Sequence, residues 1–223
     1  MVSVIFPAAG QGRRMKVGKN KVFLELKGLP ILVRTLLRFS QLQEVGQLIL
    51  AVGPSEIRDV EEMLEGVSGL KPCSIVAGGS ERQYSIANCI KMVSSDADIV
   101  LVHDAARPLV SVETIKGVID KARNVGGAIA AVPEKNTIKV VSKDGMVVST
   151  PPRESLWAVQ TPQGFQRDIL LRAYAKAEED GYLGTDDASL VERLGVPVQV
   201  VASDYRNIKI TTPEDLVIAE ALL

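Results

Sequence analysis

Five cations follow a turn of small residues close to the N-terminus. An apolar run from Val2 to Phe6 leads into Pro7-Ala8-Ala9-Gly10-Gln11-Gly12, and behind it, with no acid between them, come Arg13, Arg14, Lys16, Lys19 and Lys21. Small residues let the backbone approach a ligand and turn its N–H groups toward it, and cations directly after such a turn suit a polyphosphate. The order of strand, turn and cations therefore favours phosphate binding over a solvated surface loop. The segment is not a P-loop, which ends in Gly-Lys-Ser/Thr, nor a GxGxxG dinucleotide fingerprint.

Two further polar turns also stand directly behind apolar, strand-like runs. The turn at 78–82 follows Cys73–Ala77, and the turn at 103–107 follows Asp98–Val102. In parallel sheets, ligands bind outside the carboxyl ends of the strands. We therefore expect the turns at 7–14, 78–82 and 103–107 to meet at one edge of a sheet and to form a single site.

The side chains that the sequence lacks exclude several kinds of reaction. His103 is the only histidine, which excludes a multi-histidine metal site, and we expect it to be packed or hydrogen-bonded. No GxSxG motif is present and neither cysteine adjoins a candidate base, so covalent hydrolysis is unsupported. Trp157 is expected in the core. The remaining cations, amides and hydroxyls suit transfer at phosphorus.

Such a transfer needs little proton chemistry. An attacking phosphate monoester is largely a dianion at neutral pH and needs no general base. The catalyst has to hold two anions together and stabilise the charge on the transferred phosphorus, for which Lys, Arg, backbone amides and Mg²⁺ suffice. Asp104, at a strand end on the expected rim, is a candidate for contact with a ribose hydroxyl or a metal; capping of the following turn is the alternative.

The elements that must position these residues alternate regularly. Strands are predicted at 2–6, 47–52, 73–77, 98–102 and 128–132, with helices of ordinary length between them, one of them capped by Ser55. Strands alternating with helices predict an α/β fold, a parallel sheet with helices on both faces. Later strands are expected at 159–161, 198–201 and 207–210, and a closing helix that begins at Pro213 with Thr212 as its cap.

The alternation is interrupted once. Thr137–Val141 and Met146–Ser149 flank Lys143-Asp144-Gly145, which is a hairpin turn signal. We therefore predict that residues at about 134–155 form an arm, a β-hairpin inserted into a single domain that spans residues 1–223. The hairpin alone is equally compatible with a dimer contact and with a surface flap.

Composition adds limits on partners and location. The 223 residues carry a net charge of −1, so there is no global basic field for nucleic acid. No apolar run reaches the roughly 18–20 residues that span a bilayer, and no secretory leader is visible. Two cysteines outside any CxxC pattern are expected to be reduced thiols. We expect a cytoplasmic enzyme.

Six motifs resemble, in order, those of the 2-C-methyl-D-erythritol 4-phosphate cytidylyltransferase family. They are PAAGQGRRM (7–15), GGSERQYS (78–85), VHDAARP (102–108), TPQGF (161–165), TDDAS (185–189) and NIKIT (207–211). The resemblance covers essentially the whole chain. It implies a Rossmann-like three-layer sandwich whose β arm is exchanged across a homodimer. It also implies that the chain joins Mg²⁺-bound CTP to methylerythritol phosphate, releasing pyrophosphate, in the non-mevalonate isoprenoid pathway.

The same resemblance implies a role for each motif residue. Those that would bind the nucleotide are Ala8, Ala9, Gly10, Gly12, Gly79, Ser80, Arg82, Ser85, Asp104 and Ala105. Arg14 and Lys21 would stabilise the transition state, while Arg153 and Lys209 would aim the attacking phosphate. The second substrate would contact Asp104, Arg107, Thr137 and Thr185, with Thr137 and Arg153 reaching the partner subunit's site.

Two positions depart from the family pattern, and three other functions compete. Lys21 aligns through Phe23-Leu24, but Lys19 lies close enough to replace it, and Ser80 stands where the family often has Asp.

A cytidylyltransferase for another polyol phosphate, such as ribitol 5-phosphate, is the nearest alternative. A nicotinamide-dependent oxidoreductase lacks its GxGxxG here, and a non-catalytic nucleotide-binding regulator would not need both cation pairs.

Overall fold

The computed structural model of the chain describes residues 1–10 and 20–223. Within these residues the central sheet has seven strands in the order β11-β7-β10-β6-β1-β4-β5. Their bounds are β1 Val2–Pro7, β4 Val45–Val52, β5 Cys73–Ala77, β6 Ile99–Val102, β7 Gly127–Pro133, β10 Trp157–Gln166 and β11 Val198–Ala202. All neighbouring strands pair in parallel except β10, which is antiparallel to both β6 and β7. The predicted mostly parallel α/β sheet is confirmed.

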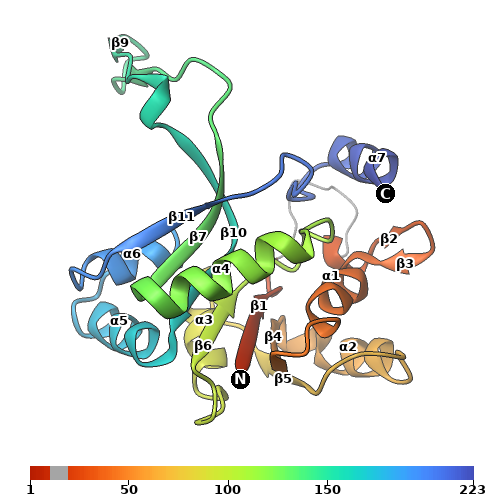
Figure 1. Cartoon of the computed structure of the whole chain (residues 1–223). Helices are drawn as coiled ribbons and strands as arrows, with labels where there is room; N and C mark the ends of the chain where they lie inside the picture. The colour runs from red at the N-terminus through yellow and green to blue at the C-terminus, as the bar shows by residue number, and fades with distance from the viewer. Residues whose placement is uncertain (11–19) are drawn as a thin grey trace.

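Helices cover both faces of the sheet because the strand side chains alternate in direction. The helices are α1 Ile31–Ser40, α2 Ile57–Leu64, α3 Arg82–Ile90, α4 Val112–Val125, α5 Arg167–Glu179, α6 Asp187–Glu192 and α7 Pro213–Leu222. Phe6 and Leu50 face a core shared with α1, α2 and α4. Ile5 and Ile49 face the opposite core, shared with α3, α5 and α6 (Figure 1). None of the described helices is long and apolar enough to cross a membrane.

The arm leaves the sheet from the end where the parallel strands finish. It connects the last residue of β7 to the first residue of β10, and it carries the short strands β8 (Val140–Val141) and β9 (Val147–Ser149) far from the sheet (Figure 1). The predicted protruding hairpin is confirmed, although its strands are shorter than expected. Trp157, expected in the core, is 40% exposed. It is the first residue of β10, at the foot of the arm, where β10 is paired with β7 but not yet with β6.

Two other local predictions are wrong. Residues 207–210 form no strand, because their backbone bonds to the turn after β6: Arg107 donates to the Asn207 carbonyl and the Ile210 N–H donates to the Ala106 carbonyl. Ser55 does not cap α2, because it lies inside the short 3₁₀ turn Pro54–Glu56 that precedes the helix. The cap at Thr212 is confirmed, since its side chain accepts from the Asp215 N–H.

Candidate active site

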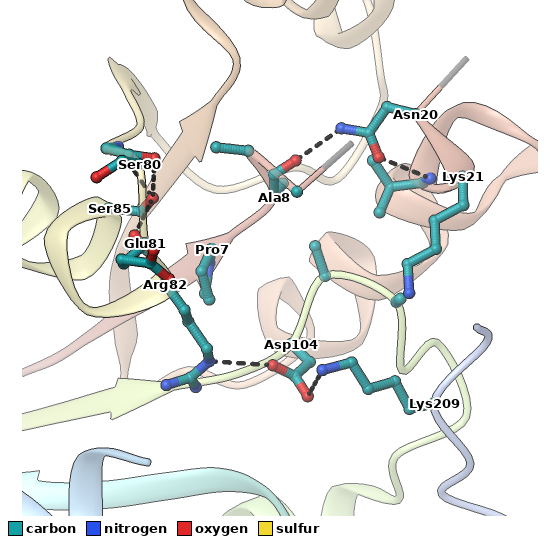
Figure 2. Close-up of a pocket in the computed structure, with 16 residues that line it drawn as sticks. Pro7, Ala8, Asn20, Lys21, Ser80, Glu81, Arg82, Ser85, Asp104 and Lys209 are labelled. Atoms are coloured by element: carbon teal, nitrogen blue, oxygen red, sulfur yellow. Dashed lines mark hydrogen bonds and ion pairs between the residues drawn. The ribbon is translucent and has the colours of Figure 1, made fainter. Parts of the chain in front are cut away.

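A cavity of about 240 Å³ lies where the loops after β1, β5 and β6 meet (Figure 2). We call it the rim pocket. The predicted convergence of the three polar turns is therefore confirmed, and residue 209 adds a fourth segment from near the C-terminus. The lining residues are Pro7, Ala8, Ala9, Gly10, Asn20, Lys21, Val22, Gly79, Ser80, Glu81, Arg82, Ser85, Asp104, Ala105, Ala106 and Lys209.

The pocket gathers eleven of the residues that the sequence singles out. Gly12 and Arg14 lie outside the described residues, as do Arg13, Lys16 and Lys19. Arg107 is not one of the described lining residues, but its guanidinium contacts the Asp104 carboxylate. Thr137, Arg153 and Thr185 are not among the described residues that line the pocket of their own chain; all three are exposed, the first two on the arm and the third before α6.

Asn20 holds the returning end of the first loop against β1. Its buried amide donates to the Ala8 carbonyl at 2.7 Å and to Glu56 Oε2 at 3.2 Å, and its Oδ1 accepts from the Val22 N–H. Glu56 in turn accepts from the Gly53 N–H at 3.0 Å, which ties the ends of β1 and β4 together. Lys21 comes next, and its side chain runs into the pocket toward the turn that carries Asp104 (Figure 2).

The loop after β5 lies against the loop after β1 because glycine occupies its first two positions. A Cβ on Gly78 would lie 2.2 Å from Ala9 Cβ, and one on Gly79 would lie 2.5 Å from Tyr84 Cβ. Ser85, at the start of α3, accepts from the Gly79 N–H at 3.0 Å and donates to the Glu81 carbonyl at 3.0 Å. The serine thereby shapes the loop as well as lining the pocket.

Asp104 is the electrostatic centre of the pocket. Its carboxylate lies 2.9 Å from Lys209 Nζ, 3.4 Å from Arg107 Nε and 3.5 Å from Arg82 Nε. Burial alone would raise the pKa of Asp104, but the charges of Lys209, Arg82 and Arg107 outweigh burial and lower this pKa below its usual value. These three cations face two carboxylates, Asp104 and the Asp187 partner of Arg82, which leaves a surplus of one positive charge and suits anionic ligands.

The backbone of this turn is fixed by a buried chain of hydrogen bonds. His103 Nε2 lies 3.1 Å from the Arg107 carbonyl, which can only accept, so Nε2 carries the proton of the neutral ring. His103 Nδ1 then accepts from the Thr161 hydroxyl at 3.1 Å, and Thr161 Oγ1 accepts from the Asp104 N–H at 3.0 Å. Burial lowers the pKa of His103 to about 3. The prediction of a packed, hydrogen-bonded histidine is confirmed, and its role is to hold the turn.

Replacing His103 with asparagine should change how stability depends on pH. The unfolded imidazole takes up a proton below its usual pKa of 6.5, whereas the folded one does so only near 3, so the native chain loses stability as pH falls between these values. The loss is up to about 1.4 kcal/mol per pH unit. We expect the asparagine variant to be less stable at about pH 7 and the difference from the parent to shrink toward about pH 4.5, measured by urea unfolding.

No other imidazole contributes, because His103 is the only histidine in the chain. Parallel stability curves for the two proteins would contradict a neutral, buried His103.

The residues present do not fit a protein-held Mg²⁺ ion. Both oxygens of Asp104 already contact cations, and a divalent ion bound there would be repelled by Lys209 and Arg82. Among residues 1–10 and 20–223, no group of three His, Cys, Asp or Glu side chains is arranged to hold a metal. These surroundings favour the ribose contact of Asp104 over the metal contact.

Sequence reasoning missed several supporting residues. Asp187 is buried and accepts from Arg82 Nη1 at 2.8 Å, although the TDDAS motif directs attention to Thr185 instead. Asn207 donates to the carbonyl of Thr161 and to Gln160 Oε1, each at 2.9 Å. Asp187 follows Thr185 and Asp186, and Asn207 follows Tyr205 and Arg206, so both lie in polar surroundings in the sequence and no hydrophobic pattern marked them as buried.

Comparison with known proteins gives one consistent family. The family model described as IspD: 2-C-methyl-D-erythritol 4-phosphate cytidylyltransferase matches residues 2–223. A curated protein of that name from Symbiobacterium thermophilum is 51% identical over 223 residues, covering 100% of this chain and 92% of the relative. Its counterpart from Bacillus pumilus is 49% identical over 221 residues, covering 99% and 96%.

Solved structures agree with the sequence comparison. The crystal structure of 4-diphosphocytidyl-2C-methyl-D-erythritol synthase from Anaerococcus prevotii is similar with a TM-score of 0.88 at 31% identity, covering 100% of this chain and 97% of that one. The 2-C-methyl-D-erythritol 4-phosphate cytidylyltransferase structure from Francisella tularensis is similar with a TM-score of 0.84 at 30% identity, covering 100% and 99%.

Proposed function

The chain belongs to the 2-C-methyl-D-erythritol 4-phosphate cytidylyltransferase family, and we propose that its rim pocket is where that family's reaction takes place. The protein is a CTP-dependent cytidylyltransferase that converts CTP and 2-C-methyl-D-erythritol 4-phosphate into 4-diphosphocytidyl-2-C-methyl-D-erythritol and pyrophosphate. The family match over residues 2–223 carries this conclusion. The relatives bear the name of the methylerythritol phosphate enzyme, and this sets aside ribitol phosphate as the substrate.

CTP is proposed to lie across the loops after β1, β5 and β6. Ala8, Ala9 and Gly10 would follow its phosphates, together with Gly12 and Arg14 from outside the described residues. Gly79, Ser80 and Ser85 would read the cytosine, with Arg82 beside them, and Asp104 and Ala105 would meet the ribose. Support comes from the placement of the described members of this set around one cavity. Magnesium would arrive bound to the CTP phosphates and leave with pyrophosphate, as part of the substrate.

The transfer itself needs charge and alignment. An oxygen of the methylerythritol phosphate forms a bond to the α-phosphorus of CTP, and the bond from that phosphorus to the bridging oxygen breaks, releasing pyrophosphate. Lys21 and Arg14 would stabilise the charge on the transferred group. Lys209 and Arg153 would aim the attacking phosphate, with Arg107 and Thr185 holding the rest of that substrate.

The second half of the site is proposed to come from another subunit. Arm residues Thr137 and Arg153 are exposed and do not line the described pocket of their own chain. Large apolar side chains on the arm and at its base are also exposed, which favours burial against a partner. They are Ile138, Val140, Val141, Met146, Val147, Val148, Trp157 and Val159. A homodimer that exchanges its arms accounts for both observations.

The single-domain organisation and the cytoplasmic location remain predictions.

A substrate panel tests the assignment. The protein is mixed with Mg²⁺, CTP and either 2-C-methyl-D-erythritol 4-phosphate or ribitol 5-phosphate, and pyrophosphate release is followed. We expect release with the methylerythritol compound. Release with ribitol 5-phosphate alone would overturn the substrate, and no release with either compound would overturn the cytidylyltransferase function.

A Gly78→Ala substitution should weaken CTP binding selectively. The added methyl would lie 2.2 Å from Ala9 Cβ, so the loop after β5 must move away from the loop after β1. We expect the KM for CTP to rise about tenfold, with a smaller change in the KM for the second substrate. Adding Ala9→Gly removes the clashing carbon and should recover part of the loss. A KM for CTP that stays at the parental value would show that the two loops need not touch.

A further inference from the structure

Arg82 lies between two carboxylates that come from different parts of the chain. Its Nε is 3.5 Å from Asp104 Oδ1 in the rim pocket, and its Nη1 donates to Asp187 Oδ2 at 2.8 Å behind it. Figure 2 shows the guanidinium pointing at Asp104 from the side opposite Lys209. The shorter contact is the one away from the pocket. Asp187 is therefore the stronger anchor of the guanidinium.

Asp187 is itself held from the far side. It has no exposed surface, and its Oδ1 accepts from the Tyr174 hydroxyl at 2.5 Å. Tyr174 belongs to α5 and Asp187 is the first residue of α6, so the chain of contacts crosses from α5 through α6 and α3 to the turn after β6. The charges of Asp187 and Asp104 outweigh burial and raise the pKa of Arg82 above its usual value.

The buried ion pair of Arg82 and Asp187 is better explained by the orientation that it gives the guanidinium than by a contribution to folding stability. Removing two charges from water is costly, and an apolar pair of similar volume often stabilises a core equally well. What the buried pair provides is a fixed guanidinium. Arg has five N–H donors in a planar fork, and a carboxylate in reach accepts two of them in parallel. Without Asp187, Arg82 is free to turn onto Asp104 and form that fork.

We propose that Asp187 and Tyr174 are positioning residues for the transfer reaction, which hold Arg82 back so that Asp104 keeps acceptor capacity for substrate hydroxyls. The inference rests on the proposed function, because it assigns Asp104 to the ribose. With Asp187 in place, only Nε of Arg82 contacts Asp104. With Asp187 removed, two nitrogens of Arg82 would bind both carboxylate oxygens of Asp104 and compete there with the ribose and with Lys209.

Steady-state kinetics on single and double variants test this role. Asp187→Asn keeps the shape but removes the charge, and we expect it to raise the KM for CTP about tenfold with a smaller change in kcat. Tyr174→Phe should move the same constant in the same direction by about threefold. Both effects should vanish in an Arg82→Gln background, because the two residues act only through Arg82.

Asp186→Asn is the matched control. Asp186 caps α6 by accepting from the Ser189 N–H at 3.0 Å, and its other carboxylate oxygen accepts from Gln163 Nε2 at 2.8 Å. It should lower stability without changing the KM for CTP. Equal effects of Asp186→Asn and Asp187→Asn, or effects that persist unchanged in the Arg82→Gln background, would overturn the proposal. If Asp187→Asn fails to fold, the KM for CTP of Tyr174→Phe, measured with and without Arg82→Gln, tests the positioning role in its place.

A crystal structure of the substrate-free Asp187→Asn variant gives a readout independent of activity. The guanidinium of Arg82 should be found paired with Asp104 through two nitrogens. An Arg82 that keeps its position would overturn the positioning role, whether or not the parent consumes CTP. A parent that fails to release pyrophosphate would overturn the proposed function instead, so the two failures are distinguishable.

Discussion

Replacing Lys21 with alanine is expected to lower kcat by about a hundredfold to a thousandfold. Lys21 lines the rim pocket and its side chain runs toward the turn that carries Asp104 (Figure 2). In the proposed reaction, charge builds on the oxygens of the transferred phosphoryl group as pyrophosphate leaves. An ammonium fixed beside those oxygens interacts more strongly with the transition state than with bound CTP, so its loss affects kcat more than KM.

The fold should tolerate the change, because it leaves the buried contacts of the neighbouring residue in place. Asn20 makes the buried bonds to Ala8 and Glu56, and it is not altered. Circular dichroism and urea unfolding of Lys21→Ala should therefore match those of the parent.

Lys19→Ala is the comparison that assigns the role. It removes the same charge two residues away, outside the described residues, and we expect kcat to change severalfold at most. A larger loss from Lys19→Ala than from Lys21→Ala would transfer the catalytic role to Lys19 and show that the family alignment through Phe23-Leu24 is displaced.

Much of the rim pocket could be predicted from sequence because its parts are local patterns. An apolar run followed by Gly, Pro or small polar residues marks the end of a strand, and parallel strands end at one edge of the sheet. That reasoning placed the turns after β1, β5 and β6 together without knowing the strand order. The sheet order itself, with β10 running antiparallel between β6 and β7, was not accessible from the same patterns.

Contacts between distant segments account for most of what sequence reasoning missed. The segment at 207–210 has an extended, strand-like pattern, but such a pattern does not reveal which backbone it pairs with. In the fold its partner is the turn at Ala106 and Arg107, and this pairing is what delivers Lys209 to Asp104. Asp187 was hidden for a similar reason, since its burial depends on how α6 packs near α3.

Trp157 illustrates a different limit. A large apolar side chain such as tryptophan favours a core position, and here it is exposed at the foot of the arm. Composition cannot distinguish a side chain buried within a subunit from one buried between subunits. In the proposed arm-exchanged homodimer, the exposed apolar residues of the arm would be buried between subunits, and Arg153 would enter the site of the partner.

Mixing two inactive variants, Arg153→Ala and Lys209→Ala, is expected to restore activity. If Arg153 serves the partner's pocket, a heterodimer has one site with both substitutions and one site with neither. A statistical 1:1 mixture contains heterodimers as half of its dimers, so about a quarter of all sites are intact. Pyrophosphate release should reach about a quarter of the parental rate after subunits are exchanged under mild denaturant and refolded.

The geometry of the arm makes this outcome the expected one. Arg153 Nη1 donates to the Lys135 carbonyl at 3.1 Å, the Lys135 ammonium lies 3.3 Å from the centre of the Tyr205 ring, and the Tyr205 hydroxyl donates to the Pro133 carbonyl at 2.7 Å. These contacts fix the base of the arm against the segment that follows β11. Folding Arg153 back into its own pocket would break them, whereas a partner can be reached with the arm as it stands. If Arg153 instead acted within its own chain, every site in the mixture would carry one substitution and no activity would return. Size-exclusion chromatography would confirm that the inactive mixture still contains dimers.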